Sequence, residues 1–177
     1  MSKTLTIALT TYNRPNFLKE SIKSILNQTF KDFDLVILDN GSSNETSSVI
    51  QSFNDTRISY VRNQINDLEF VNNAFSYTKN AFLMIFHDDD IMGKNLIENQ
   101  IKKLDSNEKI GMISCCLNLI DEEGKELHKI RPKIKKDKIW GKHEFLKDFL
   151  FKGDILPCPA TIFRSSIIKD NKLKYNF

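Results

Sequence analysis

The feature of this sequence that most constrains its fold is the alternation of apolar strand-like runs with helix-length segments. The predicted strands are Thr4–Thr10, Asp34–Asp39, Ile58–Asn63, Ala81–Phe86 and Ile110–Ile120. Helical spacing of apolar residues predicts helices over Pro15–Gln28, Ser47–Phe53, about Glu69–Lys79 and about Lys94–Leu104. Near-continuously apolar strands separated by helices favour a mostly parallel central sheet with helices on both faces, an α/β fold.

Length and composition predict one globular domain over residues 1–177. A net charge of +3 is too small to indicate nucleic acid as a partner. The longest apolar run, Ala81–Phe86, is too short to span a bilayer, and the first residues have no signal-peptide pattern. Cys115, Cys116 and Cys158 are odd in number, which favours reduced thiols and a cytoplasmic location.

Three polar clusters follow predicted strands: Thr10–Arg14 (TTYNR), Asp39–Ser43 (DNGSS) and His87–Asp90 (HDDD). In parallel α/β sheets, ligands bind outside the carboxyl ends of the strands. We therefore expect the three clusters to form one binding site at a single edge of the sheet.

The first two clusters allow two interpretations each. Asp39–Ser43 can be only a turn that caps the next helix. Alternatively, Asp39 accepts a hydrogen bond from a nucleobase N–H. Tyr12 can be a half-buried residue at a strand end, or its flat ring can pack against a base.

Three successive carboxylates, Asp88, Asp89 and Asp90, are harder to explain by structure alone. A calcium loop of the EF-hand type fails, because Met92 stands at a ligand position and Asn99 replaces the bidentate glutamate. A helix N-terminus accounts for one or two acids but not three. A hard divalent cation, Mg²⁺ or Mn²⁺, accounts for all three.

Three segments carry a resemblance to a known family. They are TTYNRPNFLKESIKSILNQTFKDFDLVILDNGSSNET (Thr10–Thr46), FHDDDIM (Phe86–Met92) and PCPATIFRSSII (Pro157–Ile168). In these segments, and over nearly its whole length, the chain resembles the N-terminal, donor-binding part of family-two glycosyltransferases. The resemblance implies the GT-A fold, a Rossmann-like arrangement around a mostly parallel sheet.

The resemblance also implies a nucleoside-diphosphate sugar donor, most often a UDP-sugar. Thr10 and Tyr12 would border the base, and Asp39 would accept the uracil N3–H. Asp88 would face the ribose, and Arg14 would belong to the same donor-binding motif.

The acidic run corresponds to the Asp-x-Asp-like motif of the family. Asp89 would bind the divalent metal on the diphosphate, and Asp90 would support it. His87 replaces the usual first acid of this motif, and a single histidine here is more often a packed residue than a ligand. On this interpretation the metal ion relieves the repulsion between the carboxylates.

Two other positions depart from the family pattern. Asn40 stands where a second acid is common, although its amide can still hydrogen-bond the sugar donor. Asn72 and Asn73 stand where many members have an Arg-Asn pair, which keeps Asn73 as a donor contact but removes the arginine. Arg62 is the alternative arginine.

An inverting transfer to a glycan or lipid-linked acceptor needs a general base. The family's base, often in a Glu-Asp pair, follows the segment that ends here, so we expect it beyond Phe177, with Asp154 as the weaker candidate. The alternative function is a nucleotide-sugar binding module that lacks the base and is catalytically silent.

A basic stretch, His128–Lys142, follows the last predicted strand. The simpler interpretation is a solvated loop. The alternative is that it attracts an anionic acceptor or the inner face of the membrane, as in peripheral membrane association. Trp140 and Phe145 could seat a sugar ring or simply pack in a core. No feature indicates the oligomeric state.

Overall fold

The structure is a computed structural model that describes residues 4–153 and 155–175. The chain divides into two compact units, one formed by Met1–Ile113 with Ile162–Phe177 and the other by Ser114–Thr161. The single domain expected from the length stays a prediction.

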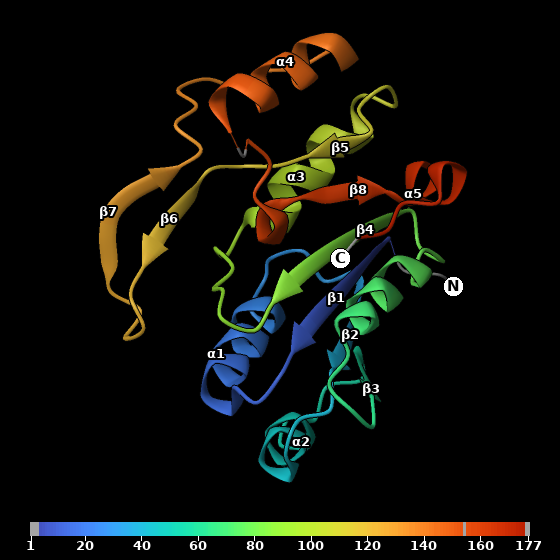
Figure 1. The fold of residues 1–177 in the computed structure, drawn as a ribbon, viewed down its shortest axis with the longest axis vertical. Coiled ribbons are helices and arrows are strands. Elements are labelled where there is room, and N and C mark those ends of the chain that lie inside the picture. Colours follow the sequence, from blue (N-terminus) through green and yellow to red (C-terminus); the bar gives the residue numbers. More distant parts are fainter. Residues whose placement is uncertain (1–3, 154, 176–177) are drawn as a thin grey trace. The chain divides into compact units, whose positions relative to one another are not determined.

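The first unit is built on a six-stranded sheet in the order β3-β2-β1-β4-β8-β5 (Figure 1). Its strands are β1 (Leu5–Thr11), β2 (Phe33–Asp39), β3 (Ile58–Arg62), β4 (Phe82–His87), β5 (Met112–Ile113) and β8 (Ile162–Arg164). The first four are parallel to one another, and β8 is antiparallel to both β4 and β5. The predicted mostly parallel sheet is confirmed.

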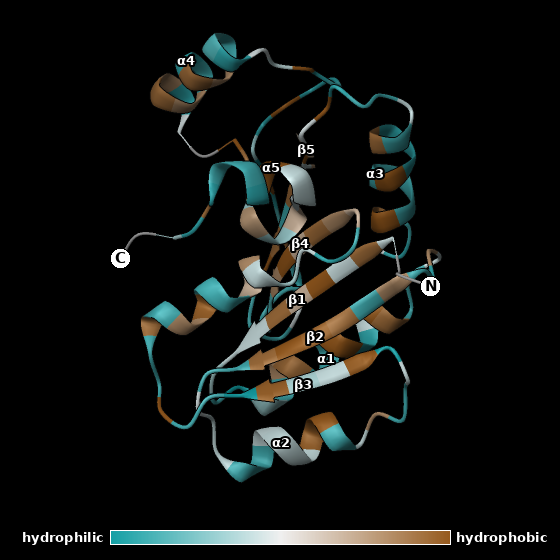
Figure 2. Cartoon of the chain, turned by 90° about the vertical axis from the view of Figure 1, so that its right-hand side faces the viewer, coloured by the Kyte–Doolittle hydropathy of each residue, from teal (hydrophilic) through white to brown (hydrophobic). Residues whose placement is uncertain are grey.

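Helices flank this sheet on both faces (Figures 1 and 2). They are α1 (Pro15–Leu26), α2 (Asn44–Gln51), α3 (Leu96–Asp105) and α5 (Ser165–Asn171), with the 3₁₀ helix η1 (Leu68–Ser76). Pro15 begins α1, where its fixed φ and missing N–H cost nothing. Leu18, Ile22 and Ile25 form the buried face of α1, whereas Phe17, expected on the same face, is 40% exposed.

The core is formed by the central strands together with α1, α2 and α3. Leu5, Ile7 and Leu9 of β1 and Leu35 and Ile37 of β2 have no exposed surface. Each such side chain contributes ~1.5–3 kcal/mol when it is fully buried. Figure 2 shows the brown, hydrophobic segments that make up much of β1 and β2. It fixes the strands whose ends carry the candidate site.

Two predicted elements are wrong in detail. The expected strand Ile110–Ile120 is divided into β5 and β6 (Leu117–Ile120), which belong to different sheets. The segment expected to be an α-helix is the 3₁₀ helix η1. In η1, Asn72 donates to Glu69 and Ser76 donates to the carbonyl of Asn73, so these side chains support the three-residue spacing of a 3₁₀ helix.

The second unit contains a two-stranded antiparallel sheet of β6 and β7 (Glu126–Arg131). It also contains α4 (Lys142–Lys152) and the short 3₁₀ helix η2 (Cys158–Ala160). The basic stretch expected as a loop therefore begins within a strand. In the part of the chain that the structure describes, no helix combines the length and apolar character needed to cross a bilayer.

Candidate functional site

The register of the parallel strands brings the three polar clusters together. Thr10 of β1 is level with Leu38 of β2 on one side and with His87 of β4 on the other. Thr11 is level with Asp39. The residues that follow each strand therefore lie at the same edge of the sheet.

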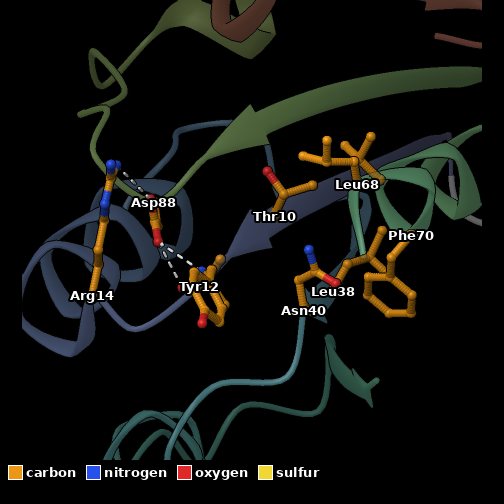
Figure 3. A pocket seen from close by; sticks show the side chains of 10 residues that line it. Thr10, Tyr12, Arg14, Leu38, Asn40, Leu68, Phe70 and Asp88 are labelled. Atoms are coloured by element: carbon orange, nitrogen blue, oxygen red, sulfur yellow. Dashed lines mark hydrogen bonds and ion pairs between the residues drawn. The ribbon is translucent and has the colours of Figure 1, made fainter. Parts of the chain in front are cut away.

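A hollow of about 280 Å³ opens at this edge (Figure 3). It is lined by Thr10, Thr11, Tyr12, Arg14, Leu38, Asn40, Leu68, Phe70, Val71 and Asp88. One rim is polar and contains Asp88 and Arg14, and the other is apolar and comes from η1. The ring of Tyr12 is 43% exposed, so a flat aromatic surface is open to a ligand.

Asp88 is the acidic residue that lines the hollow, and it is only 5% exposed. One of its oxygens accepts hydrogen bonds from the Thr11 hydroxyl at 2.7 Å and from the Tyr12 N–H at 3.4 Å. Burial raises the pKa of this carboxyl, while Thr11 and the nearby Arg14 oppose the rise. The fold thus holds one carboxylate in a fixed orientation beside Tyr12.

Arg14 is the positive partner of the acidic run. Its guanidinium donates to Asp89 at 2.7 Å and lies 3.6 Å from the other oxygen of Asp88. Figure 3 shows the side chain of Arg14 reaching toward Asp88. We expected a metal ion to relieve the carboxylate repulsion, and the structure shows that a residue of the chain already does part of this.

Asp90 has no such partner. Among the described residues none forms a hydrogen bond or ion pair with its carboxylate. Burial, followed by the charges of Asp89 and Asp88, raises the pKa of Asp90 to about 6. A desolvated carboxylate beside two others is stabilised by a hard cation, and Mg²⁺ or Mn²⁺ prefers such oxygen ligands.

The donor set therefore fits a divalent ion that completes its coordination with water and phosphate oxygens. Within residues 4–153 and 155–175 there is no group of three or more His, Cys, Asp or Glu residues arranged to hold a metal by protein ligands alone. Asp89, which is bonded to Arg14, would have to share or exchange that partner.

Asp39 lies beneath the site rather than on its wall. It has no exposed surface and accepts hydrogen bonds from the Ser42 N–H at 2.8 Å and from the Tyr60 hydroxyl at 2.6 Å. Burial and then this hydrogen bond to Asp39 raise the pKa of Tyr60. Asp39 therefore organises the turn, and its contact with a nucleobase stays a prediction.

Thr10 and His87 are bonded to each other across the strand ends. The Thr10 hydroxyl lies 2.9 Å from His87 Nδ1, and the His87 carbonyl accepts a hydrogen bond from Ser21 at 3.2 Å. This arrangement agrees with a packed histidine that orients its neighbour.

Asn40 forms part of the wall of the hollow and is held by the loop after β3. Its amide donates to Asn66 at 2.7 Å, and its oxygen accepts the Asp67 N–H at 3.0 Å. The next residue, Gly41, has φ +85°, and a Cβ there would lie 2.7 Å from the backbone carbon of Ile65. Glycine is therefore required for the close approach of these two loops.

Three apolar residues of the hollow were not predicted from the sequence: Leu68, Phe70 and Val71, all from η1. The apolar cluster LEFV before the asparagine pair was the available signal. Asn73, predicted to contact the sugar donor, does not line the hollow and is exposed on η1. Asn72 instead bonds the backbone of Tyr175 at 2.7 and 3.2 Å.

Arg62 and Asp154 complete the predicted set. The guanidinium of Arg62 donates to the Ser42 carbonyl and to Asn44 and lies 3.8 Å from Asp39, so it braces the turn outside the hollow. Asp154, the weaker candidate for the catalytic general base, lies outside the described residues.

The sequence matches a known family over most of its length. Residues 6–170 match the model described as Glycosyl transferase family 2. The chain is 32% identical over 180 residues to the uncharacterized glycosyltransferase MJ1057 of Methanocaldococcus jannaschii, covering 97% of this chain and 59% of that protein. It is 28% identical over 179 residues to a Campylobacter jejuni protein named GalNAc(5)-diNAcBac-PP-undecaprenol beta-1,3-glucosyltransferase, covering 98% and 55%.

Solved structures share the fold at lower identity. S. aureus TarS 1-349 in complex with UDP has a TM-score of 0.71 and 18% identity, covering 98% of this chain and 50% of that one. Mannosyltransferase PcManGT from Pyrobaculum calidifontis, in complex with GDP-Man and Mn²⁺, has a TM-score of 0.66 and 14% identity, covering 97% and 47%. The chain thus spans about half the length of these relatives, from 47% to 59%.

Proposed function

Because the chain belongs to glycosyl transferase family 2 and has the GT-A fold, we propose that it binds a UDP-sugar in the hollow at the end of β1, β2 and β4. With a divalent metal, it takes part in transfer of the sugar, with inversion, to a glycan or lipid-linked acceptor. If the chain did not bind UDP in the titration described below, this proposal would have no basis.

The observation that carries the proposal is the pairing of an open aromatic ring with a fixed carboxylate. Tyr12 is 43% exposed, and its backbone N–H is bonded to the buried Asp88. In our proposal the ring packs against the base, and Asp88 accepts a hydrogen bond from the ribose. Thr10, Arg14 and Asn40 lie around the same hollow and contact the remainder of the donor.

Selection of uracil is assigned to Asp39. Its oxygens already accept from Ser42 and Tyr60, which orients the carboxylate without saturating it. Donor binding would have to open the turn over this fully buried carboxylate so that the uracil N3–H could donate to it.

Asp89 and Asp90 are the residues that would hold the divalent ion. Bound there, the ion would neutralise charge on the diphosphate and so favour its departure. The chain's own contribution is a carboxylate pair whose charge is compensated on one side by Arg14 and uncompensated at Asp90.

The relatives support this assignment without deciding it for this chain. TarS has been solved with UDP and with UDP-GlcNAc. The name of the C. jejuni relative specifies an undecaprenol-linked diphosphate acceptor. A UDP-sugar and a lipid-linked acceptor are therefore the first compounds to test.

A donor-binding module without transferase activity is the second candidate. Asp88, the acid that lines the hollow, is bonded to Thr11 and Tyr12, so it is poorly placed to take a proton from an acceptor. Incubation with a bound UDP-sugar and a pool of acceptors, followed by mass spectrometry, separates the two. Glycoside product supports the transferase and overturns the module, whereas binding without product agrees with the module and with a transferase whose general base is not among residues 1–177.

The donor site itself is tested by titration calorimetry with UDP in the presence of Mn²⁺. We expect Tyr12→Ala to weaken binding about tenfold or more, because base–aromatic stacking contributes ~1–3 kcal/mol. Phe17→Ala is the matched control, since Phe17 is similarly exposed at 40% but does not line the hollow. Equal losses in both variants, or none in Tyr12→Ala, would remove the aromatic contact from the proposal.

A further inference from the structure

The second unit, Ser114–Thr161, has a hollow of its own, of about 660 Å³. It is lined by His128, Lys129, Ile130, Arg131, Lys133, Ile134 and Lys135. Four of these side chains are Lys or Arg, and we call Lys129, Arg131, Lys133 and Lys135 the basic hollow. No acidic residue lines it.

The charges of the basic hollow are not compensated. Among the residues that the structure describes, none forms an ion pair or a side-chain hydrogen bond with any of its four cations. Two acids of the unit, Glu144 and Asp148, contact other lysines: Lys138 lies 2.8 Å from Glu144 and 2.9 Å from Asp148, and Lys152 lies 2.8 Å from Asp148. Unpaired like charges around one hollow repel one another, and a bound anion relieves that repulsion.

The helix that follows, α4, presents apolar side chains to solvent. Phe145, Leu146, Phe149 and Leu150 have the spacing of one helix face, and Leu146 and Leu150 are 53% and 69% exposed. The charged Asp148 is instead buried and accepts a hydrogen bond from Trp140 at 2.8 Å. Figure 2 shows the mixed hydropathy of this helix. A surface helix normally has the opposite orientation, so this face is available to an apolar environment.

The segment between the basic hollow and α4 also contains both lysines and an exposed apolar side chain. Ile139, which precedes α4, is 73% exposed, and Lys135 and Lys136 lie shortly before it. A nucleic acid would match the cations but not the exposed aliphatic and aromatic side chains. A surface that combines phosphate charge with hydrocarbon matches both.

We propose that Ser114–Thr161 binds the surface of an anionic lipid bilayer. Lipid phosphates occupy the basic hollow, and the apolar face of α4 enters the boundary between headgroups and acyl chains, as in interfacial amphipathic helices. This inference does not depend on sugar-donor binding, which belongs to the other unit. It would place the chain at a membrane, where a lipid-linked acceptor resides.

The experiment is co-sedimentation of the whole chain with vesicles of phosphatidylcholine containing 30% phosphatidylglycerol, compared with pure phosphatidylcholine. We expect binding to the anionic vesicles that decreases with added salt, because exposed charges are screened. The variant Lys133→Glu with Lys135→Glu should bind at least about 30-fold more weakly, given the usual contribution of each cation near an anionic leaflet. Leu146→Ser with Leu150→Ser should weaken binding at low salt and at high salt alike.

A matched control is Lys19→Glu with Lys94→Glu, which changes the net charge equally at exposed positions of the other unit. It should retain most of the vesicle binding, and all variants should keep the circular-dichroism spectrum of the unmodified chain. Equal losses in the control and the basic-hollow variant would mean that net charge alone is responsible, and would overturn the proposal. So would calorimetry showing that inorganic diphosphate binds the basic hollow while anionic vesicles do not.

Discussion

The guanidinium of Arg14 donates a hydrogen bond to Asp89 at 2.7 Å, at the point where three carboxylates follow β4. The pair joins the first turn after β1 to the end of β4, two segments 75 residues apart in sequence. It places a positive charge beside the residue that we propose as the principal metal ligand. A divalent ion at Asp89 would therefore compete with Arg14 for the same oxygens.

The first prediction concerns this competition. Without nucleotide, Arg14→Ala should bind Mn²⁺ about two- to fivefold more tightly, because removing a half-exposed ion pair is worth ~0.4–1 kcal/mol. Calorimetric titration with Mn²⁺ measures the change. Lys19→Ala, an exposed cation elsewhere on the same unit, should leave the affinity unchanged. Tighter binding in both variants would mean that long-range charge, rather than the Arg14–Asp89 contact, sets the metal affinity.

Much of the sheet could be predicted from the sequence because its strands are buried on both faces. β1, β2 and β4 are almost wholly buried and mostly apolar, and this pattern favours a parallel sheet when helices separate the runs. The division of Ile110–Ile120 into β5 and β6 could not be predicted in this way. Nothing in the local pattern of IGMISCCLNLI indicates that its two halves pair with different strands.

In the candidate site, too, some features could be predicted from the sequence and others could not. The convergence of Thr10, Asp39 and His87 follows from parallel strands and was predictable. The bond between Arg14 and Asp89, and the exchange of Asn73 for Phe70 on the wall of the hollow, depend on tertiary geometry. A 3₁₀ helix turns its side chains by a different angle from an α-helix, so the helix type decides which residues of this segment line the hollow.

The second prediction tests the metal ligand. Asp89→Asn should remove most of the Mn²⁺-dependent gain in UDP affinity and leave the fold intact, because the side chain of Asp89 is 49% exposed and the amide is nearly the same size. UDP titrations with Mn²⁺ and with EDTA give the gain for each variant. Glu98→Gln, a surface acid of α3, is the control. An unchanged gain in Asp89→Asn would be incompatible with its role as principal ligand.

The third prediction concerns pH and the position of β3. Arg57 donates to both oxygens of Asp55 at 2.9 and 2.7 Å and lies over the ring of Phe33. The hydrogen bond from Arg57 lowers the pKa of Asp55 from 3.8 to about 2. Because the folded pKa is the lower one, the stabilisation is present above pH 3.8 and is lost as the pH falls toward 2.

Asp55→Asn should therefore lower the free energy of unfolding at pH 6 by at most about 1 kcal/mol, since the pair is partly solvated. The difference from the unmodified chain should shrink between pH 4 and pH 2. Urea unfolding at pH 6, 4 and 2.5 measures it. Glu20→Gln, which breaks the exposed pair of Glu20 with Lys23, should have a smaller effect at every pH. A difference that does not change with pH would show that Asp55 acts by packing alone.

The last prediction is that Asp39 determines which nucleobase the chain prefers. Uracil presents N3–H to an acceptor, whereas cytosine presents a lone pair that would face the carboxylate. A hydrogen bond to a charged group contributes ~1.5–3 kcal/mol, so UDP should bind at least about tenfold more tightly than CDP. Asp39→Ala should remove most of that difference.

Because Asp39 is buried and accepts hydrogen bonds from Ser42 and Tyr60, Asp39→Ala should also be less stable. Tyr60→Phe separates the loss of stability from the loss of nucleobase preference. Tyr60→Phe removes one hydrogen bond to Asp39 but keeps the carboxylate, so it should lose stability and retain the preference for UDP. Equal affinity of the unmodified chain for UDP and CDP would leave Asp39 with only its role in the turn.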